Sequence, residues 1–396
     1  MDAYAPYMKT HPEQFKITAV AECNEKRRSE FVARFGISEN MCFKSYRDFF
    51  AEPKMCDCVL ICTQDKIHFE PAMLAMERGY HVYLEKPVSA DVNELKALKQ
   101  RAENYDKLFM TGYVLRYTPF FIKMLNTIKS GAIGRIASVQ HNENEGWWHH
   151  AHSYVRGPWG NSEKSSPLIL AKSCHDMDML LCIAQAGCKS ISSYGSNLFF
   201  CKENAPENSS PRCTVCRLAE SCKYNAYKAY THGKSKYFAH LIGKSDAEVI
   251  ESLKTSPYGR CVFRCDNNVP DHQVTAMEFE NGITAVFTVC AFTERNTRTI
   301  KIMGTEGEIG GCMEDGEIVL RRFNGEEKKI TVTHDGSKHC GGDSGIMNAL
   351  FKKIDCGDIA FDSKIFDSHI MALAAEKSRL SGNTELLSDF ENKYFR

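Results

Sequence analysis

The sequence predicts two domains: a doubly wound α/β domain, followed by an α+β domain with a large, mostly antiparallel open sheet. The chain has 396 residues, which is more than one hydrophobic core usually supports. In its first part, short apolar runs alternate with helical patterns at the spacing of βαβ units. In its last part, long segments alternate apolar and polar residues, which indicates antiparallel strands with one covered face. We expect the domains to span 1–113 and 114–396.

Periodicity gives the elements of the first domain. Residues 57–63 form a continuous apolar run, typical of a parallel strand that is buried on both faces. Gly79 closes the helical pattern before it, because glycine readily takes the left-handed conformation at a helix end. The predicted strands lie at 15–21, 57–63, 81–84 and 108–112, and the predicted helices at 24–35, 68–78 and about 91–103.

The character of the chain changes after Gly131, where the second domain's elements begin with a strand at Ile136. A polar, cysteine-rich insertion covers about 200–266. The helix predicted at 364–380 is a candidate to pack back on the first domain. The other predicted elements are a helix at 168–184, strands at 272–280, 283–292, 298–303, 308–311, 317–322 and 329–333, and a helix near 344–354.

Composition excludes several classes of protein. Lys and Arg number 50 and balance 50 Asp and Glu, so no basic field exists to attract nucleic acid or an anionic membrane. No apolar run approaches the length of a transmembrane helix, and the start resembles no signal peptide. We therefore expect a cytoplasmic protein whose 18 cysteines are mostly reduced thiols.

Polar groups follow the predicted strands of the first domain, at the edge where open α/β sheets bind ligands. They are Glu22, Thr63-Gln64, Glu85-Lys86 and Gly112-Tyr113. An acid after the second strand typically binds a ribose hydroxyl pair, so Glu22 favours NAD over NADP in a Rossmann-type dinucleotide-binding domain. Arg27 and Arg28 keep NADP open, because nearby arginines accept a 2′-phosphate. Lys86 is either a solvated lysine or, in a cleft, an acid/base catalyst.

Six motifs in order along the chain make the resemblance specific: Glu85-Lys86-Pro87, Leu115-Arg116-Tyr117, 130–134 (SGAIG), 172–178 (KSCHDMD), 304–307 (GTEG) and 341–343 (GGD). Together they resemble the glucose-fructose oxidoreductase/inositol dehydrogenase/MocA family (Gfo/Idh/MocA). Its members are two-domain nicotinamide enzymes that act on sugars and polyols. The resemblance implies reversible hydride transfer between NAD(H) and a secondary alcohol of a sugar, sugar derivative or cyclitol.

The resemblance also implies roles for single residues. Lys86 resembles the lysine that contacts the reacting hydroxyl, and His175 resembles the histidine that shares acid/base duty; the alternative for His175 is a core histidine. Many members have an aspartate where this chain has Ala171, and Lys172 beside it could lower the pKa of Lys86 by like-charge repulsion. The candidate catalytic residues are Lys86, His175 and Lys172, and the candidate cofactor contacts are Glu22, Thr63, Gln64, His68, Glu85, Lys86, Pro87 and Arg116.

The sequence departs from the family at its start, where a strand and a glycine-rich turn would hold the pyrophosphate at a helix N-terminus. About a dozen residues are absent relative to this pattern, since Tyr4, Tyr7 and Met8 already resemble the inner face of the helix after the turn. We favour a start codon placed too late. The alternative is a chain that binds cofactor poorly.

Residues 146–160 hold all three tryptophans together with histidines and Arg156, a combination that suits stacking on a sugar ring and binding its hydroxyls. The alternative is a loop that packs against its own domain. The candidate substrate contacts are Tyr117, Arg156, Trp159, Asp176 and His272.

Cysteines are densest in the insertion, where a C-x-x-C pair is followed by a third cysteine six residues later. Four thiolates arranged tetrahedrally would bind a structural zinc. The alternatives are an iron–sulfur cluster, free thiols and packed core residues. The candidate ligands are Cys213, Cys216 and Cys222, with Cys261 as the fourth and Cys201 or Cys265 in reserve.

Two rival functions remain open, an NAD-dependent glycosidase that oxidises its substrate transiently and a non-catalytic protein that has lost cofactor binding. Net NADH release separates the first rival from a dehydrogenase. The open sheet predicts a homodimer or homotetramer, with one sheet face against the domain's own helices and the other against a neighbouring subunit.

Overall fold

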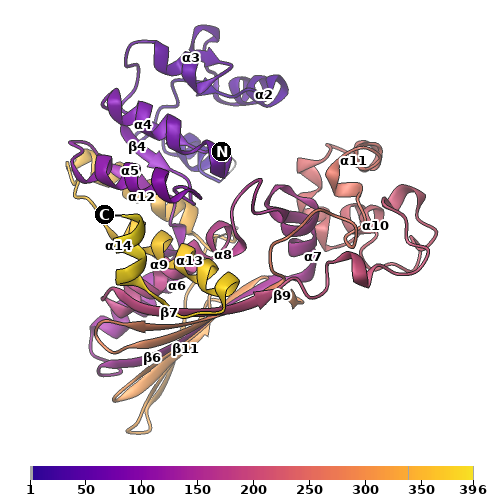
Figure 1. Ribbon diagram of the computed structural model, residues 1–396. Coiled ribbons are helices and arrows are strands. Elements are labelled where there is room, and N and C mark those ends of the chain that lie inside the picture. Colours follow the sequence, from indigo (N-terminus) through magenta and orange to yellow (C-terminus); the bar gives the residue numbers. More distant parts are fainter. Residues whose placement is uncertain (1–2, 338, 396) are drawn as a thin grey trace. The chain divides into compact units, whose positions relative to one another are not determined.

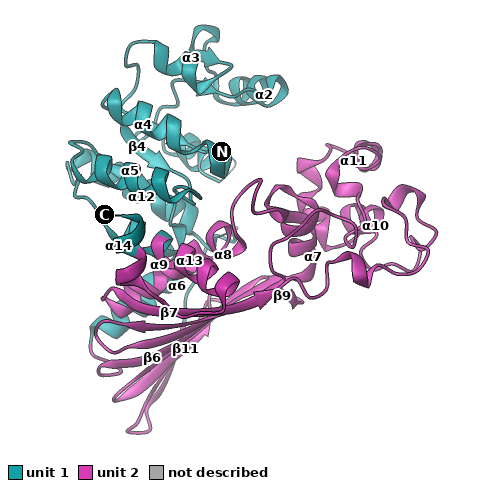
Figure 2. Ribbon diagram, in the orientation of Figure 1, with its two compact units in different colours: residues 1–130, 331–369, 391–396 teal, residues 131–330, 370–390 magenta. Residues whose placement is uncertain are grey.

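The computed structural model describes residues 3–337 and 339–395. The chain divides into two compact units, one of residues 1–130, 331–369 and 391–396, and one of residues 131–330 and 370–390 (Figure 2). The predicted boundary at 113 thus falls inside unit 1, which also recruits a segment from far along the chain.

Unit 1 is built on parallel strands (Figure 1). Strands β3 (Cys58–Ile61), β4 (His81–Leu84) and β5 (Phe109–Thr111) pair in that order, and β1 (Val20–Ala21) pairs separately with β2 (Cys42–Phe43). The strand predicted at 15–21 is therefore only two residues long, because β2 offers it a partner over two residues. The helices of this unit are α1 (Ala5–Thr10), α2 (Glu25–Phe35), α3 (Tyr46–Ala51), α4 (Phe69–Glu77), α5 (Val92–Glu103), α6 (Pro119–Lys129) and α12 (Gly342–Asp355).

The core of unit 1 joins segments that are distant in sequence. Tyr4, which precedes α1, and Met8 of α1 pack with Tyr83 of β4 and with Ile346 and Met347 of α12. The first turn of α13 (Lys364–Ser381) also belongs to this unit, where Phe366 stacks on Phe109 with ring centroids 6.1 Å apart. These contacts hold the carboxyl ends of β3, β4 and β5 in one rigid frame.

Unit 2 contains a nine-stranded sheet in the order β13-β12-β11-β10-β6-β9-β8-β7-β14. All neighbouring pairs described are antiparallel except β6 with β9, which confirms the predicted, mostly antiparallel sheet. The strands are β6 (Ile136–Gly146), β7 (Cys188–Ser196), β8 (His272–Phe279), β9 (Thr284–Thr293), β10 (Thr297–Gly304), β11 (Gly307–Cys312), β12 (Glu317–Arg322), β13 (Glu327–Thr331) and β14 (Glu385–Leu386), and α14 (Leu387–Tyr394) follows.

Helix α9 (Cys174–Ala184) and the later part of α13 lie along one face of this sheet (Figure 1). The single helix predicted at 168–184 is two helices, because α8 (Leu168–Ala171) ends before Lys172 and α9 begins after Ser173. The interruption sets Lys172 between two helices and starts a new helix at the motif that contains His175.

The insertion lies beyond one end of the sheet (Figure 1). Its helices include α10 (Ala226–Thr231) and α11 (Asp246–Leu253), and α7 (Trp147–His150) with a π-helical turn (Ala151–Arg156) packs beside them. Aromatic residues form two small cores here, one around Tyr224 and Phe263 and one around Tyr230 and Phe238. Within the described residues, no helix has the length and apolarity needed to span a membrane.

Candidate functional site

Lys86 lies in unit 1, on the loop that leaves the carboxyl end of β4. Two buried histidines fix this loop. His68, 1% exposed, lies with Nδ1 2.6 Å from the Pro87 carbonyl oxygen and Nε2 3.1 Å from the Thr63 carbonyl oxygen. It therefore ties the end of β3 to the end of β4. Both ring nitrogens of His68 face backbone carbonyls, which gives it a positioning role, and its predicted contact with the cofactor remains a prediction.

His369 of α13 is the second anchor. Its Nε2 accepts the Val88 N–H at 2.6 Å, and its Nδ1 lies 2.9 Å from the Ile365 carbonyl oxygen and 2.6 Å from the Tyr113 hydroxyl. Burial lowers the pKa of His369 to about 4. The imidazole is thus neutral at physiological pH, with its proton on Nδ1, and it keeps Nε2 free to hold the loop.

Glu85 binds the backbone N–H of Lys86 and is itself bound by the Tyr4 hydroxyl. The Tyr4 hydroxyl donates to one Glu85 carboxylate oxygen, and the Lys86 N–H donates to the other at 3.1 Å. Burial, and then the charge of Glu85, raise the pKa of Tyr4 and Tyr83 well above the ordinary value of a phenol. A Cβ on Gly112 would lie 2.9 Å from Glu85 Oε2, so the end of β5 needs a residue without a side chain to admit this carboxylate.

Glu22 lies just past the end of β1, where the ribose of a dinucleotide is expected. It accepts the Asn24 N–H at 2.8 Å and pairs with Arg27 through Nε at 3.1 Å and Nη2 at 2.8 Å. Burial alone would raise the pKa of Glu22, but the hydrogen bonds from Arg27 and Asn24 lower it. The Glu22 carboxylate suits the ribose hydroxyls of NAD, and the Arg27 guanidinium suits the 2′-phosphate of NADP. The two groups are paired, so this strand end carries a determinant for each cofactor.

These strand ends fit a nicotinamide dinucleotide in part. Thr63 and Gln64 are exposed after β3, and Glu22 and Lys86 follow β1 and β4. Among the described residues, no glycine-rich turn joins a strand to a helix ahead of Glu22, and β1 and β3 each pair along one edge only. The residues present therefore suit the two ends of the cofactor, and a cradle for the pyrophosphate is not among them.

Arg116 and Tyr117 follow β5 on a 3₁₀ turn (Val114–Tyr117). Arg116 forms an ion pair with Asp362, and its guanidinium lies 5.8 Å from the centre of the Tyr113 ring. Tyr117 packs against the unit 1 core. Both residues lie close to the end of β5 within unit 1, and their predicted contacts with cofactor and substrate remain predictions.

In unit 2, a buried ionic network underlies Lys172 and His175. His141, Glu143 and Glu145 alternate along β6, so all three side chains lie on one face of the sheet. Glu143 pairs with Lys172 at 3.1 Å and with Arg298 of β10 at 2.5 Å. Glu143 thus holds the Lys172 side chain within its own unit.

Asp176 belongs to the same network. It is fully buried, and it accepts hydrogen bonds from His141 Nε2 at 2.7 Å and Arg298 Nε at 2.9 Å. Burial raises the pKa of Asp176, but the charges of Arg298 and His141 lower it far more. Asp176 thus ties the first turn of α9, and with it His175, to the sheet, and its predicted contact with substrate remains a prediction.

Glu145 extends the network towards the aromatic segment. Its Oε2 accepts a hydrogen bond from His150 Nδ1 at 3.0 Å, and Lys172 adds a favourable charge. Burial opposes ionisation, but the His150 hydrogen bond brings the pKa of Glu145 down to about 2. Burial, followed by repulsion from Lys172, lowers the pKa of His149 to about 3, so His149 is neutral.

Arg156, a predicted substrate contact, binds groups of its own unit. Its side chain is 2% exposed, and it donates to the carbonyl oxygens of Arg260 at 2.8 Å and Tyr224 at 2.6 Å. These bonds anchor its segment, and the predicted contact with a sugar remains a prediction. Trp159 is half-buried with its ring centroid 6.3 Å from that of Tyr154, which agrees with the alternative of a loop packed on its own domain.

His272 remains a candidate substrate contact. Its Nδ1 lies 2.8 Å from Asp271, and its side chain is 41% exposed. Asp271 in turn accepts the Phe199 N–H at 2.7 Å. The contact with Asp271 thus orients the imidazole of His272, whose side chain remains partly open to solvent.

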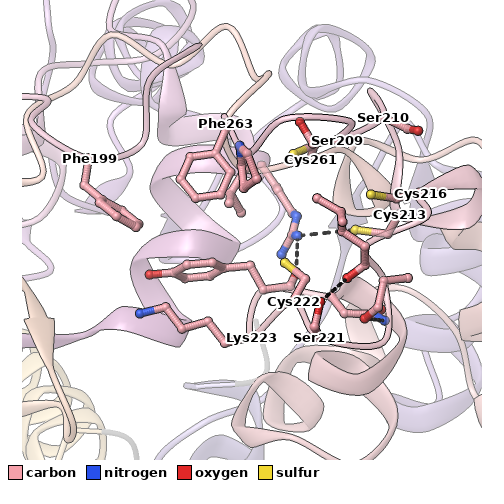
Figure 3. Close-up of a pocket in the computed structure, with 17 residues that line it drawn as sticks. Phe199, Ser209, Ser210, Cys213, Cys216, Ser221, Cys222, Lys223, Cys261 and Phe263 are labelled. Carbon is pink, nitrogen blue, oxygen red and sulfur yellow. Dashed lines mark hydrogen bonds between the residues drawn. The ribbon is translucent and has the colours of Figure 1, made fainter. Parts of the chain in front are cut away.

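The structure brings the four predicted metal ligands to one cavity of about 270 Å³ (Figure 3). Cys213, Cys216, Cys222 and Cys261 all line it, whereas Cys201 and Cys265 do not. The predicted zinc site itself is not shown, because no group of three His, Cys, Asp or Glu residues in the described part of the chain lies close enough to hold one ion.

Sequence reasoning missed several residues of these sites. They are Glu143, Glu145 and His141 on β6, Arg298 on β10, and His369 on α13. The alternation of charged residues in His141-Asn142-Glu143-Asn144-Glu145 was a usable signal, since a two-residue period places every charge on one face of a strand. His369 had no local signal, because its partner Val88 is 281 residues away.

Two protein-family models match this chain. A model described as "Oxidoreductase family, NAD-binding Rossmann fold" matches residues 1–113, and one described as "Oxidoreductase family, C-terminal alpha/beta domain" matches residues 126–340. The putative oxidoreductase YteT of Bacillus subtilis (strain 168) is 22% identical over 371 residues, 87% of this chain and 84% of that protein. The 2,7-anhydro-N-acetylneuraminate hydratase of Escherichia coli (strain K12) is 26% identical over 194 residues, 49% of each chain.

Among solved structures, a levoglucosan dehydrogenase in complex with NADH and levoglucosan has the same fold. Its TM-score is 0.69 at 18% sequence identity, and the match covers 97% of this chain and 95% of that one.

Proposed function

Because the chain belongs to the Gfo/Idh/MocA family of oxidoreductases, we propose that it transfers a hydride between a nicotinamide cofactor and a secondary alcohol of a sugar, sugar derivative or cyclitol. The observation that carries the proposal is Lys86, set at the end of β4 and held there by His68, His369 and Glu85. The levoglucosan dehydrogenase of the same fold, which was solved with NADH and levoglucosan, supports both the cofactor and the substrate class.

The bound nicotinamide supplies the hydride acceptor or donor. Glu22 would bind the adenosine ribose, and Thr63 and Gln64 would line the cofactor's path across the strand ends. Glu22 favours NAD, and its ion pair with Arg27 (2.8 Å) leaves some affinity for NADP. Glu85 and Pro87 would shape the nicotinamide side.

The chain's own residues must move one proton. Hydride loss from a carbinol carbon leaves a carbonyl, so the hydroxyl proton has to go to a base. Lys86 Nζ is the proposed partner of that hydroxyl. His175, held at the start of α9 through its neighbour Asp176, is proposed to share the acid/base role, with Lys172 Nζ as a hydrogen-bond donor.

The test is a panel of sugars, sugar acids and cyclitols incubated with NAD⁺ or NADP⁺ while NAD(P)H absorbance is followed. At least one compound should give reduced cofactor and ketone in equal amounts, and Lys86→Met should abolish the signal while cofactor still binds. The proposal fails if cofactor binds and no compound in the panel is oxidised.

A redox-neutral reaction is the second candidate, favoured by the similarity to an E. coli hydratase. Here transient oxidation would acidify the neighbouring C–H, a group would be eliminated or water added, and the hydride would return. Such an enzyme releases no NADH. It should instead exchange deuterium from D₂O into the C–H next to the oxidised carbon, and a true dehydrogenase should not.

A further inference from the structure

The insertion of unit 2 encloses a cavity that none of the proposed chemistry uses. It measures about 270 Å³, and four thiols line it (Figure 3). Cys213 and Cys216 flank a 3₁₀ turn, Cys222 follows six residues later, and Cys261 comes from the far end of the insertion beside the Arg212–Arg260 bridge. Phe199, Tyr224 and Phe263 form its apolar wall.

The thiols do not meet the geometry of a single zinc ion. Zinc holds thiolates at about 2.3 Å, so the sulfur atoms of a tetrahedral site lie within roughly 4 Å of one another. No such close group occurs among the described residues. An iron–sulfur cluster also takes four thiolates, but its own iron and sulfide atoms fill the centre and hold the thiolates farther apart. Four thiols that line one cavity supply the donor set for such a cluster.

The positive charge of the buried Arg156 would stabilise thiolates at this site. Arg156 borders the cavity, is almost wholly buried, and donates from Nη2 to Cys213 Sγ at 3.8 Å. Its nearer partners are the carbonyl oxygens of Arg260 and Tyr224, and neither is charged. A buried guanidinium is costly without an anion close by, and four metal-bound thiolates supply one.

Cys213 already has the hydrogen-bond environment of a ligating sulfur. The Ala226 N–H donates to Cys213 Sγ at 3.4 Å, in addition to the bond from Arg156. Donors aimed at sulfur stabilise a thiolate and tune a cluster that it binds.

We propose that Cys213, Cys216, Cys222 and Cys261 bind an iron–sulfur cluster through four thiolates, each of which releases its proton on binding. The cluster has a structural role. It joins the two ends of the insertion, whose described residues form short helices and turns, and a bound metal centre contributes folding free energy to such a segment.

The test begins with the wild-type chain, purified without oxygen and reconstituted with iron and sulfide. Iron and acid-labile sulfide should be present in a one-to-one ratio, with a broad visible absorption that dithionite bleaches. Cys216→Ser and Cys222→Ser should each lose most of the iron. Cys265→Ser is the matched control, since its thiol donates to the Cys261 carbonyl at 3.2 Å and does not line the cavity; it should keep the cluster.

Three results would overturn the proposal: one zinc per chain with no labile sulfide, no metal retained after reconstitution, or equal loss of iron in Cys265→Ser. The metal content of the wild-type chain decides the matter even if a variant fails to fold. The assay is independent of the proposed oxidoreductase activity, because it measures bound iron and sulfide and needs no substrate.

Discussion

Three side chains hold the backbone around Lys86. His68 contacts the Pro87 carbonyl oxygen, His369 accepts the Val88 N–H, and Glu85 accepts the Lys86 N–H. The flexible lysine side chain therefore starts from a rigid backbone, which is what a proton-transfer group needs to reach a substrate hydroxyl reproducibly.

Lys86→Met should still bind NAD⁺ and lose turnover by about 100-fold or more, because general acid/base catalysis contributes at least that much. Calorimetry and the NADH assay measure the two effects separately. Lys44→Met, at an exposed position of the same unit, serves as the control and should leave both unchanged. Full activity in Lys86→Met would remove Lys86 from the mechanism.

His369 should make stability depend on pH. Burial lowers its pKa from 6.5 to about 4, so between these values the unfolded chain binds a proton that the folded chain excludes. This contribution to stability is complete above pH 6.5 and decreases as the pH falls, by about 2 kcal/mol near pH 5.

His369→Gln removes that titration while its amide can still accept the Val88 N–H. Urea unfolding near pH 7.5 and near pH 5 should show a smaller pH-dependent loss for the variant than for the wild-type chain. An identical loss in both proteins would mean that His369 is not buried as a neutral imidazole.

At the scale of elements, strand β6 supplies the histidine and two carboxylates of the buried ionic network in unit 2. Its two-residue period aims His141, Glu143 and Glu145 at the start of α9 and at Lys172. The break between α8 and α9 then leaves Lys172 outside either helix, where it reaches Glu143.

Glu143→Gln should destabilise the protein by about 3–5 kcal/mol, since it leaves Arg298 and Lys172 with one buried carboxylate fewer. The change in urea midpoint measures this loss. Glu278→Gln is the matched control on the same sheet. Its ion pair with Lys189 at 3.1 Å is exposed, so the loss should be below about 1 kcal/mol. Equal effects of the two substitutions would contradict a buried network at Glu143.

Gly112→Ala should lower turnover more than stability, because the new Cβ would press on Glu85 Oε2 at 2.9 Å and on the Tyr83 hydroxyl at 3.0 Å. Displacement of Glu85 moves the loop that carries Lys86. Gly187→Ala, whose Cβ would meet only the flexible end of Glu280, should behave as wild type. Wild-type turnover in Gly112→Ala would show that Glu85 does not position the loop.

The sequence predicted where strands end better than it predicted which residues contact one another. Glu22 and Glu85 were predictable because each follows an apolar run abruptly, and such a change of polarity marks the end of a buried strand. Strand β7 was missed, because Cys-Lys-Ser-Ile-Ser-Ser-Tyr-Gly-Ser has few β-branched residues and weak alternation. The carbonyl partners of Arg156 could not be predicted, since an arginine among aromatic residues has the same sequence signature whether it faces a ligand or backbone carbonyls.

At the scale of the whole molecule, the open face of the nine-stranded sheet bears on the predicted oligomer. Tyr194 and Val274 are register partners on β7 and β8 and are 62% and 37% exposed. Apolar side chains paired on an open sheet face are typical of a surface that a second subunit covers.

Light scattering should therefore report a dimer or tetramer for the wild-type chain. Substitution of both Tyr194 and Val274 by glutamate should shift it towards the monomer. Leu380→Glu, at an exposed apolar position on α13, should leave the mass unchanged. A wild-type monomer would exclude the predicted assembly.

The central claim is that the strand ends around Glu22 and Lys86 belong to a nicotinamide site, and calorimetric titration with NAD⁺ tests it most directly. The titration is made on the 396-residue chain. We predict one NAD⁺ per chain, with weaker binding after Glu22→Ala. No NAD⁺ binding would contradict the oxidoreductase account.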